Sequence, residues 1–257
     1  MPTSDGTPKI PYDAAGRSED SGEGSLFNLL AQTDFFYNKF EDDFRGDLLL
    51  DEYPAAKTNG ASAAVTFTEH NAHGFLDFIT GTANNGYAGQ GVGLQWTGDR
   101  GILAEFLFTT PSSIADYKLE VGMADADDAA GMVNSKSGVT STGTDYAVLI
   151  YDTAEDSTTE LIHAKAGTTA AVSNTDFVLA VSTLYYVTFR IDGDNVKASI
   201  QGLTGTPTAR YEFANATAAA GIEGATALTP WFFTQARAGS ASKTTPLSKW
   251  RVLEPAY

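Results

Sequence analysis

The sequence contains no cysteine and only three histidines among its 257 residues. Without cysteine, the chain can form neither disulfide bonds nor thiolate metal sites, and it has no cysteine nucleophile. Basic residues are also scarce, since 16 lysines and arginines accompany 32 acidic residues and give a formal net charge of −16. Binding to a phosphate backbone needs clustered cations, so this balance argues against a nucleic-acid partner.

Long apolar runs are missing as well. No stretch approaches the roughly 20 apolar residues that a membrane-spanning helix needs. The segment Met1–Asp5 has neither the basic region nor the apolar stretch of a secretion signal. We therefore expect no membrane partner and a chain that is soluble from its synthesis.

The sequence is instead rich in short apolar groups separated by Gly, Thr, Ser, Asn and Asp. The clearest example is Tyr185–Gly202, in which two alternating apolar segments flank the turn residues Asp192–Asn195. Such turn residues tolerate positive φ and bond their own backbone, so this segment predicts a β-hairpin. Further strands are predicted over residues 63–68, 74–80, 91–96, 102–109, 117–124, 145–152, 159–164, 176–180, 209–213, 229–236 and 247–253.

Short strands at regular intervals predict an all-β fold, a two-sheet antiparallel jelly-roll sandwich over residues 35–257. Within it, Tyr117–Met123 alternates apolar residues with Lys118 and Glu120, which predicts one buried face and one face in water. In contrast, Tyr146–Tyr151 is apolar on both faces. This pattern is typical of a strand that is covered on both sides or that packs against a partner.

Residues 1–34 are predicted to form an extended N-terminal arm with a short helix near Ser25–Gln32. The first part of the arm is too poor in apolar residues to offset its ordering entropy alone. It is therefore either a disordered tail or an arm that becomes ordered on a neighbouring subunit. In the second case, Ile10, Pro11 and Tyr12 are the expected interface residues.

No arrangement of residues supports catalysis, so we expect no enzyme activity. A glycosidase needs two carboxylates on either side of the scissile bond. Glu105 stands alone between apolar neighbours, and Glu120 is expected to face solvent. The spacing of His70 and His73 would suit a metal ion, but no third ligand follows them, so a surface turn explains both.

Two kinds of ligand remain open. Acidic loops after two predicted strands offer hard oxygen atoms to calcium. Neither loop matches an EF-hand, and solvated loops are the favoured explanation, because charged clusters usually face water. A sugar would need an exposed aromatic ring with amide groups nearby, which Asn84–Tyr87 supplies, with Trp96 in its vicinity. The calcium candidates are Asp125, Asp127, Asp128, Asp152 and Asp156. No other cofactor is expected.

A series of weak motifs occurs in order along residues 35–257, and together they resemble a family. This order is similar to that of the concanavalin A-like, laminin-G-type jelly rolls among the structural proteins of tailed bacteriophages. The motifs are residues 40–44, 75–82, 102–108, 121–125, 145–152, 191–195, 228–232 and the final strand around Trp250.

The resemblance implies a non-enzymatic virion protein, a capsid decoration (cement) protein on the outer surface of the phage head. Its expected partners are the phage major capsid protein and copies of itself, and the chain is expected to be made in the host cytoplasm. The acidic charge agrees with the outer surface, because packaged DNA would repel it. The alternative is a carbohydrate-binding, lectin-like module displayed on the virion to attach to host glycans.

Overall fold

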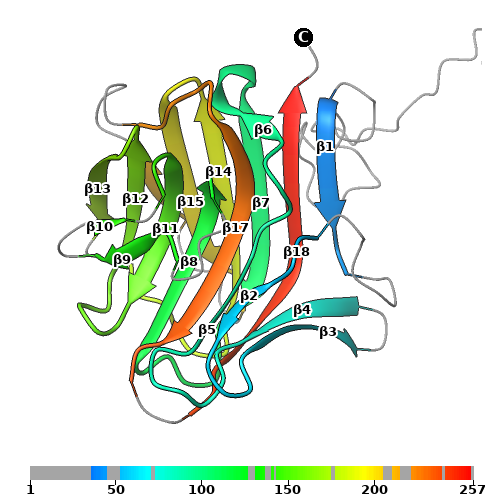
Figure 1. Ribbon diagram of the computed structural model, residues 1–257, viewed down its shortest axis with the longest axis vertical. Coiled ribbons are helices and arrows are strands. Elements are labelled where there is room, and N and C mark those ends of the chain that lie inside the picture. Colours follow the sequence, from blue (N-terminus) through cyan, green and yellow to red (C-terminus); the bar gives the residue numbers. More distant parts are fainter. Residues whose placement is uncertain are drawn as a thin grey trace, which may run out of the picture.

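The structure is a computed structural model that describes residues 36–44, 53–70, 73–126, 131–136, 140–141, 143–174, 177–204, 210–214, 221–238 and 241–255. In this part of the chain, two antiparallel sheets pack face to face, as Figure 1 shows. The predicted all-β sandwich is therefore confirmed. The predicted arm, with Ile10, Pro11 and Tyr12, lies outside the described residues and stays a prediction. No helix in the described part is long and apolar enough to cross a membrane.

The first sheet, called the β7 sheet below, is organised around the long strand β18. The first part of β18 pairs with β4, its last part pairs with β1, and its other edge pairs with β7. In spatial order the strands are β16 (Tyr211–Ala214), β15 (Asn195–Gly202), β14 (Leu184–Asp192), β7 (Ile102–Thr109), β18 (Thr244–Pro255), β4 (His73–Ile79) and β3 (Ala64–His70), with β1 (Phe36–Asp42) beside β18.

The second sheet, called the β8 sheet, lies over the first. Its strands in spatial order are β13 (Thr168–Asn174), β12 (Thr159–Lys165), β11 (Tyr146–Asp152), β8 (Tyr117–Ala124), β17 (Ala227–Ala236), β5 (Tyr87–Gln90) and β2 (Lys57–Asn59), while β6 (Trp96–Thr97) pairs with the start of β17. The short ladder β9 (Val133–Ser135) and β10 (Thr140–Ser141) and the 3-10 turn η1 (Gly98–Arg100) complete the described elements.

The hairpin that the sequence predicted most clearly is present as β14 and β15. Asp192 and Asn195 are the last paired residues before the turn. The alternating residues Tyr185, Val187 and Phe189 are buried in the core between the sheets. The alternation of apolar and polar residues therefore predicted both the pairing and the buried face.

Two strand predictions were wrong. In residues 91–96, only Trp96 belongs to a strand, because the Thr229 hydroxyl rather than a neighbouring strand accepts the hydrogen bond from the Val92 amide. Residues 177–180 bury Phe177 but form no strand. There, the Tyr185 hydroxyl accepts from the Ala180 amide at 2.7 Å. Side-chain oxygen atoms thus take the place of a ladder partner at both positions.

The aromatic end of the core ties β1 to β18. Phe40 packs edge-on against Trp250 and Trp96, with ring centroids 6.0 and 6.1 Å apart. The Trp250 indole donates to the Tyr53 hydroxyl, which in turn donates to the Asp42 carboxylate. The indole, the hydroxyl and the carboxylate of this part-buried relay each have a partner, so burying them carries no large desolvation penalty.

His163 on β12 is buried as a neutral side chain. It is 1% exposed and lies between Ala147 of β11 and Ala170 of β13 in the ladder. Burial lowers the pKa of His163 below its ordinary value, and a backbone hydrogen bond with Gly221 opposes that shift only in part. In the unfolded chain the same imidazole regains a pKa of about 6.5.

We therefore expect the free energy of unfolding to fall as the pH drops below about 6.5, because the unfolded state then binds more protons than the folded state. The loss from His163 is at most about 1.4 kcal/mol per pH unit. Urea unfolding between pH 8 and pH 5 measures it. In the His163→Gln variant, the free energy of unfolding should fall less steeply with pH between pH 6.5 and 5. The same steepness as in the wild type would contradict the assignment of this pH dependence to His163.

Candidate functional site

The outer face of the β8 sheet carries a row of polar side chains that runs across five strands. The ladder registers place Asn59, Tyr87, Gln235, Lys118 and Asp152 side by side, one on each of β2, β5, β17, β8 and β11. Exposure falls along this polar row, from exposed Asn59 and half-buried Tyr87 to fully buried Lys118 and Asp152. The row is therefore accessible at its β2–β5 end only.

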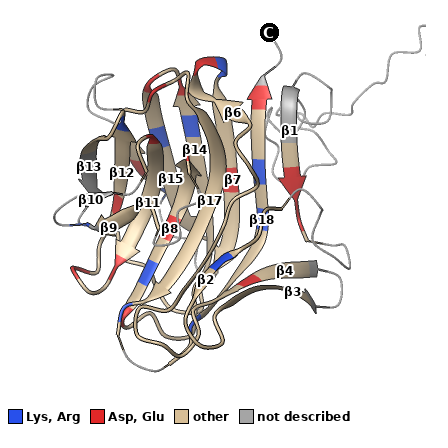
Figure 2. Ribbon diagram, in the orientation of Figure 1, with Lys and Arg blue, Asp and Glu red and all other residues tan. Residues whose placement is uncertain are grey.

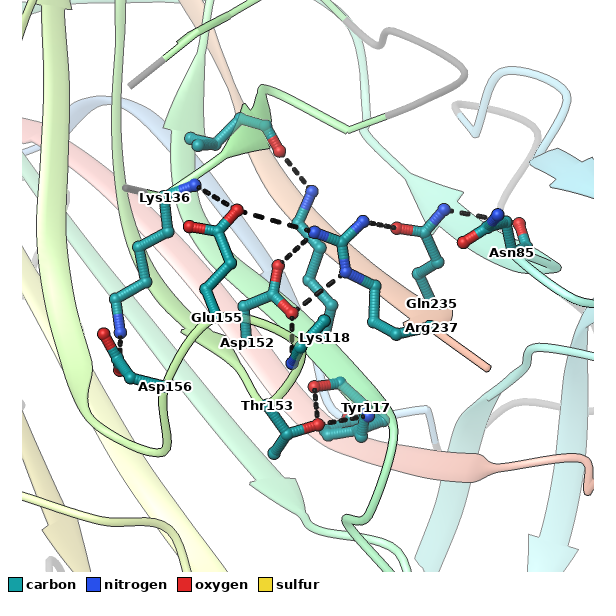
Figure 3. A network of polar contacts seen from close by, with 12 residues as sticks. Asn85, Tyr117, Lys118, Lys136, Asp152, Thr153, Glu155, Asp156, Gln235 and Arg237 are labelled. Carbon is teal, nitrogen blue, oxygen red and sulfur yellow. Dashed lines mark hydrogen bonds and ion pairs between the residues drawn. The ribbon is translucent and has the colours of Figure 1, made fainter. Parts of the chain in front are cut away.

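A chain of hydrogen bonds runs from Asp152, at the buried end of the polar row, to the backbone of Asn85 (Figure 3). The Arg237 guanidinium holds both oxygen atoms of Asp152, with Nε 2.9 Å from Oδ1. Its Nη1 donates to the Gln235 side-chain oxygen, and the Gln235 amide donates to the backbone oxygen of Asn85. Bidentate pairing of this kind fixes the geometry of both groups. The orientation of Gln235 is therefore set from the buried end.

Lys136 extends the network toward β12. Its ammonium group binds the Asp156 carboxylate and the Thr158 backbone oxygen, the latter at 2.8 Å. Its backbone N–H donates to Glu155, whose carboxylate also lies 3.9 Å from Arg237. Burial alone would raise the pKa of Asp156, but hydrogen bonds from Lys136 and Thr158 outweigh that effect and hold the pKa below its usual range.

Among the described calcium candidates, Asp152 and Asp156 are occupied by cations and Asp125 by backbone and hydroxyl groups. Asp152 and Asp156 pair with Arg237 and Lys136 as described, and Asp127 and Asp128 lie outside the described residues. One carboxylate oxygen of Asp125 accepts hydrogen bonds from residues 144–145. Within the described part of the chain, no group of three acidic or histidine side chains could hold a metal ion. The described residues therefore give the calcium hypothesis no support, and its candidates Asp127 and Asp128 stay untested.

Lys118 and Glu120 are fully buried, so the expectation that their face of β8 lies in water was wrong. Their charged groups are 2.7 Å apart. Glu120 also accepts hydrogen bonds from the amides of Met132 and Val133, at 2.7 and 3.0 Å, and from the Trp231 indole. This carboxylate thus fastens residues 131–133, called the cover segment, onto the sheet.

The cover segment explains why β11 (Tyr146–Asp152) is apolar on both faces. Met132 and Val133 join Tyr146, Val148 and Ile150 in a second buried cluster, separate from the core between the sheets. Residues of the same chain, rather than a partner, therefore contact the outer face of β11. A glycine is required at position 131, because φ is +88° and a Cβ would lie 2.9 Å from a Glu120 oxygen.

Glu105 and Glu120 cannot act as a pair, because they lie on the outer faces of different sheets. The Tyr186 hydroxyl donates to Glu105, which also pairs with Arg251. The acid diagonal to Glu120 in the ladder is Asp152, and each of these two is neutralised by its own cation. None of these three carboxylates is exposed in a cleft of the kind that glycoside hydrolysis needs.

The predicted sugar loop lies at the accessible end of the polar row. Asn84 and Asn85 are exposed, and the half-buried Tyr87 ring lies 5.5 Å from the Phe233 ring. Trp96 does not belong to this site, because it is fully buried against Phe40 in the core. Asn59 and Gln235 could not be predicted from the sequence, since only the pairing of β2, β5 and β17 brings them beside the loop.

We expect the Lys118–Glu120 pair to couple strongly in a double-mutant cycle. Either Lys118→Met or Glu120→Leu alone leaves a buried charge unpaired, which typically destabilises by about 3–5 kcal/mol. The double variant should lose much less stability than the sum of the two single-variant losses. This holds although the amides of the cover segment then lack their acceptors. Urea unfolding at pH 7 gives the free energy of unfolding of the wild type, both single variants and the double variant. Additive losses of stability would show that the two charges act independently.

We expect chelation to leave the midpoint of thermal unfolding unchanged, because Arg237 and Lys136 already neutralise Asp152 and Asp156. Calorimetry of the full chain with EDTA, and then with excess CaCl₂, measures this. A midpoint that rises with calcium and falls with EDTA would instead support a calcium site, since a ligand bound only by the folded state stabilises it.

Comparison with known proteins agrees with this architecture. No family model and no curated protein matches the sequence. A protein of unknown function from Shewanella oneidensis MR-1 is similar in structure, with a TM-score of 0.60 and 16% identity over 90% of this chain and 95% of that one.

Two plant lectins are similar as well. Lectin II from Ulex europaeus has a TM-score of 0.57 and 10% identity, over 86% of this chain and 100% of its own. The lectin from Bauhinia forficata in complex with GalNAc has a TM-score of 0.55 and 9% identity, over 85% and 99%. The chain therefore has the two-sheet sandwich fold of the concanavalin A-like legume lectins.

Proposed function

We propose that this protein is a non-catalytic carbohydrate-binding module and that it binds sugar at the accessible end of the polar row. The contact residues in this proposal are Asn59, Asn84, Asn85, Tyr87 and Gln235. The observation that carries the proposal is the fold, which matches lectins along nearly their whole length, including one in complex with galactose and one in complex with GalNAc.

The chemistry of this end suits a sugar. Carboxamide groups donate and accept at the same time, as do the hydroxyl groups of a sugar, and three asparagines and Gln235 are brought together here. Tyr87 adds a half-buried aromatic ring, and the apolar face of a sugar ring can pack against such a ring. Arg237 holds Gln235 in a fixed orientation, so this amide is preorganised before binding.

The state of the carboxylates supports a binding role over catalysis. Glu105, Glu120 and Asp152 each pair with a cation and are at most 8% exposed. A general acid or nucleophile must reach the glycosidic oxygen or the anomeric carbon. In the part of the chain described here, these three acids stabilise the sheets instead.

A second candidate function is the capsid decoration predicted from the sequence. It is supported by the net charge of −16 and by the order of motifs along the chain. None of the similar structures named above is described as a virion protein, so this role rests on the sequence alone. The two functions are compatible, because a lectin-like module on the outer surface of a head could attach the particle to host glycans.

The test is a glycan array probed with the full chain, followed by calorimetry on the best ligand. We expect saturable binding, weakened about tenfold by Asn84→Ala and by Tyr87→Ala, since a loss of 1.4 kcal/mol corresponds to a factor of ten. Tyr87→Phe keeps the ring and should bind nearly normally. Gln201→Ala, which removes an amide from the outer face of the other sheet, should bind normally. The absence of any saturable glycan, with a cooperative thermal transition intact, would refute the proposal.

A further inference from the structure

The outer face of the β7 sheet carries one row in which cationic and apolar side chains follow one another. The registers place Lys197 of β15 opposite Arg190 of β14, Arg190 opposite Leu103 of β7, and Leu103 opposite Leu253 of β18. All four point away from the core between the sheets, because their strand neighbours Val196, Ile191, Ala104 and Val252 belong to it. Leu253 is itself fully buried, so the accessible members are Lys197, Arg190 and the half-buried Leu103. This row is called the cationic row below.

The pairing of Arg190 with Lys197 opposes the usual rule for sheets. Side chains directly opposite each other in an antiparallel pair are close, and like charges there are destabilising. The Arg190 side chain is 71% exposed, and its acidic neighbour Asp192 is 4.0 Å away and equally exposed, so it compensates little. Lys197 makes no ion pair with any described residue.

A third exposed cation lies beside this pair. The Arg210 side chain, 54% exposed, reaches Thr188 of β14 with an Nη2–Oγ1 distance of 3.4 Å. Arg210 directly precedes β16, and its Nε lies 3.8 Å from the Glu212 carboxylate, which is 77% exposed and therefore compensates little. These three exposed cations lie together in a chain with twice as many acidic as basic residues. Figure 2 shows the blue segments of β14 and β15 side by side on the β7 sheet. An unfavourable local arrangement of this kind points to an anionic partner.

The chain itself contains a segment of complementary chemistry. Residues 1–35 contain six acidic residues and two basic ones, together with apolar residues such as Leu26, Phe27 and Leu30. The acids would pair with the cations of the cationic row, and the apolar residues would cover Leu103, which is half-buried. Neither match alone is specific, but the row presents both kinds of group in one line.

The point where this segment joins the β7 sheet also fits. Phe36 is the Cα partner of Pro255, two residues beyond Leu253 on β18, so the segment ends beside the apolar end of the row. From β1 to β15 there are four strand spacings, or about 19 Å. About six extended residues cover that distance, so Glu19, Asp20 and Glu23 are well within reach.

We propose that the acidic N-terminal segment, residues 1–35, docks along the cationic row of its own chain. The segment is joined covalently to β1, and a short connection of this kind gives an effective concentration in the millimolar range. Docking on its own chain is therefore favoured over docking on a neighbouring chain. This docking is independent of the sugar site, which lies on the other sheet. It differs from the arm exchange predicted from the sequence, in which Ile10, Pro11 and Tyr12 contact a neighbouring subunit.

The experiment uses the full chain, whose lack of cysteine allows a single reactive position to be introduced cleanly. Asn195→Cys places a benzophenone maleimide on the exposed end of β15, two residues from Lys197 on the same face. After irradiation, we expect mass spectrometry to find the cross-link in residues 1–35 of a chain of monomer mass. The yield should fall several-fold in 1 M salt, where the Debye length is about 3 Å.

Charge reversal supplies the matched controls. Arg190→Glu with Lys197→Glu should lower the yield several-fold, whereas Lys57→Glu, which changes the net charge on the other sheet, should leave it unchanged. Replacing Glu19, Asp20 and Glu23 by lysine in the reversed variant should restore the yield, which no loss of folding could imitate. Cross-links outside residues 1–35, cross-links between two chains, or yields insensitive to charge reversal would each overturn the proposal.

Discussion

The hydrogen bonds that Glu120 accepts from the cover segment are the interaction on which the architecture of the β8 sheet depends. A sheet in a two-layer sandwich normally has one face in water, yet every residue of β8 and β11 is buried. The Glu120 carboxylate fastens Met132 and Val133 over Tyr146, Val148 and Ile150. Without this attachment, an apolar face would lie open to solvent, and such faces promote association.

The same attachment determines where a ligand can bind. Because the cover segment buries the middle of the outer face, the polar row is accessible only at β2 and β5. There, the side chains are amides and one tyrosine rather than charged groups. The buried Asp152–Arg237 pair contributes indirectly, since it orients Gln235 for this end. The fold thus uses its charged groups for support and leaves neutral groups for recognition.

The sequence predicted the sandwich because short strands follow one another at regular intervals and several of them alternate apolar and polar residues, as the β14–β15 hairpin shows. It failed for β8, since Lys118 and Glu120 look like solvent-facing residues until the cover segment is placed over them. The sugar loop at Asn84–Tyr87 could be found from its turn residues. Asn59 and Gln235 could not, because 176 positions of sequence separate them and only strand pairing brings them together.

The shortage of basic residues makes the position of each one informative. Lys118, Lys136, Arg237 and Arg251 each neutralise a carboxylate in or near a buried position, and a buried acid without such a partner would be strongly destabilising. Arg190, Lys197 and Arg210 neutralise no buried carboxylate in the described part of the chain: Arg190 and Lys197 lie opposite each other, and the ion pairs of Arg190 with Asp192 and of Arg210 with Glu212 are exposed. A protein with so much excess acid has many positions where these cations would be better compensated. Their grouping on β14, β15 and the start of β16 is therefore better explained by contact with an acidic segment than by the stability of the sheet.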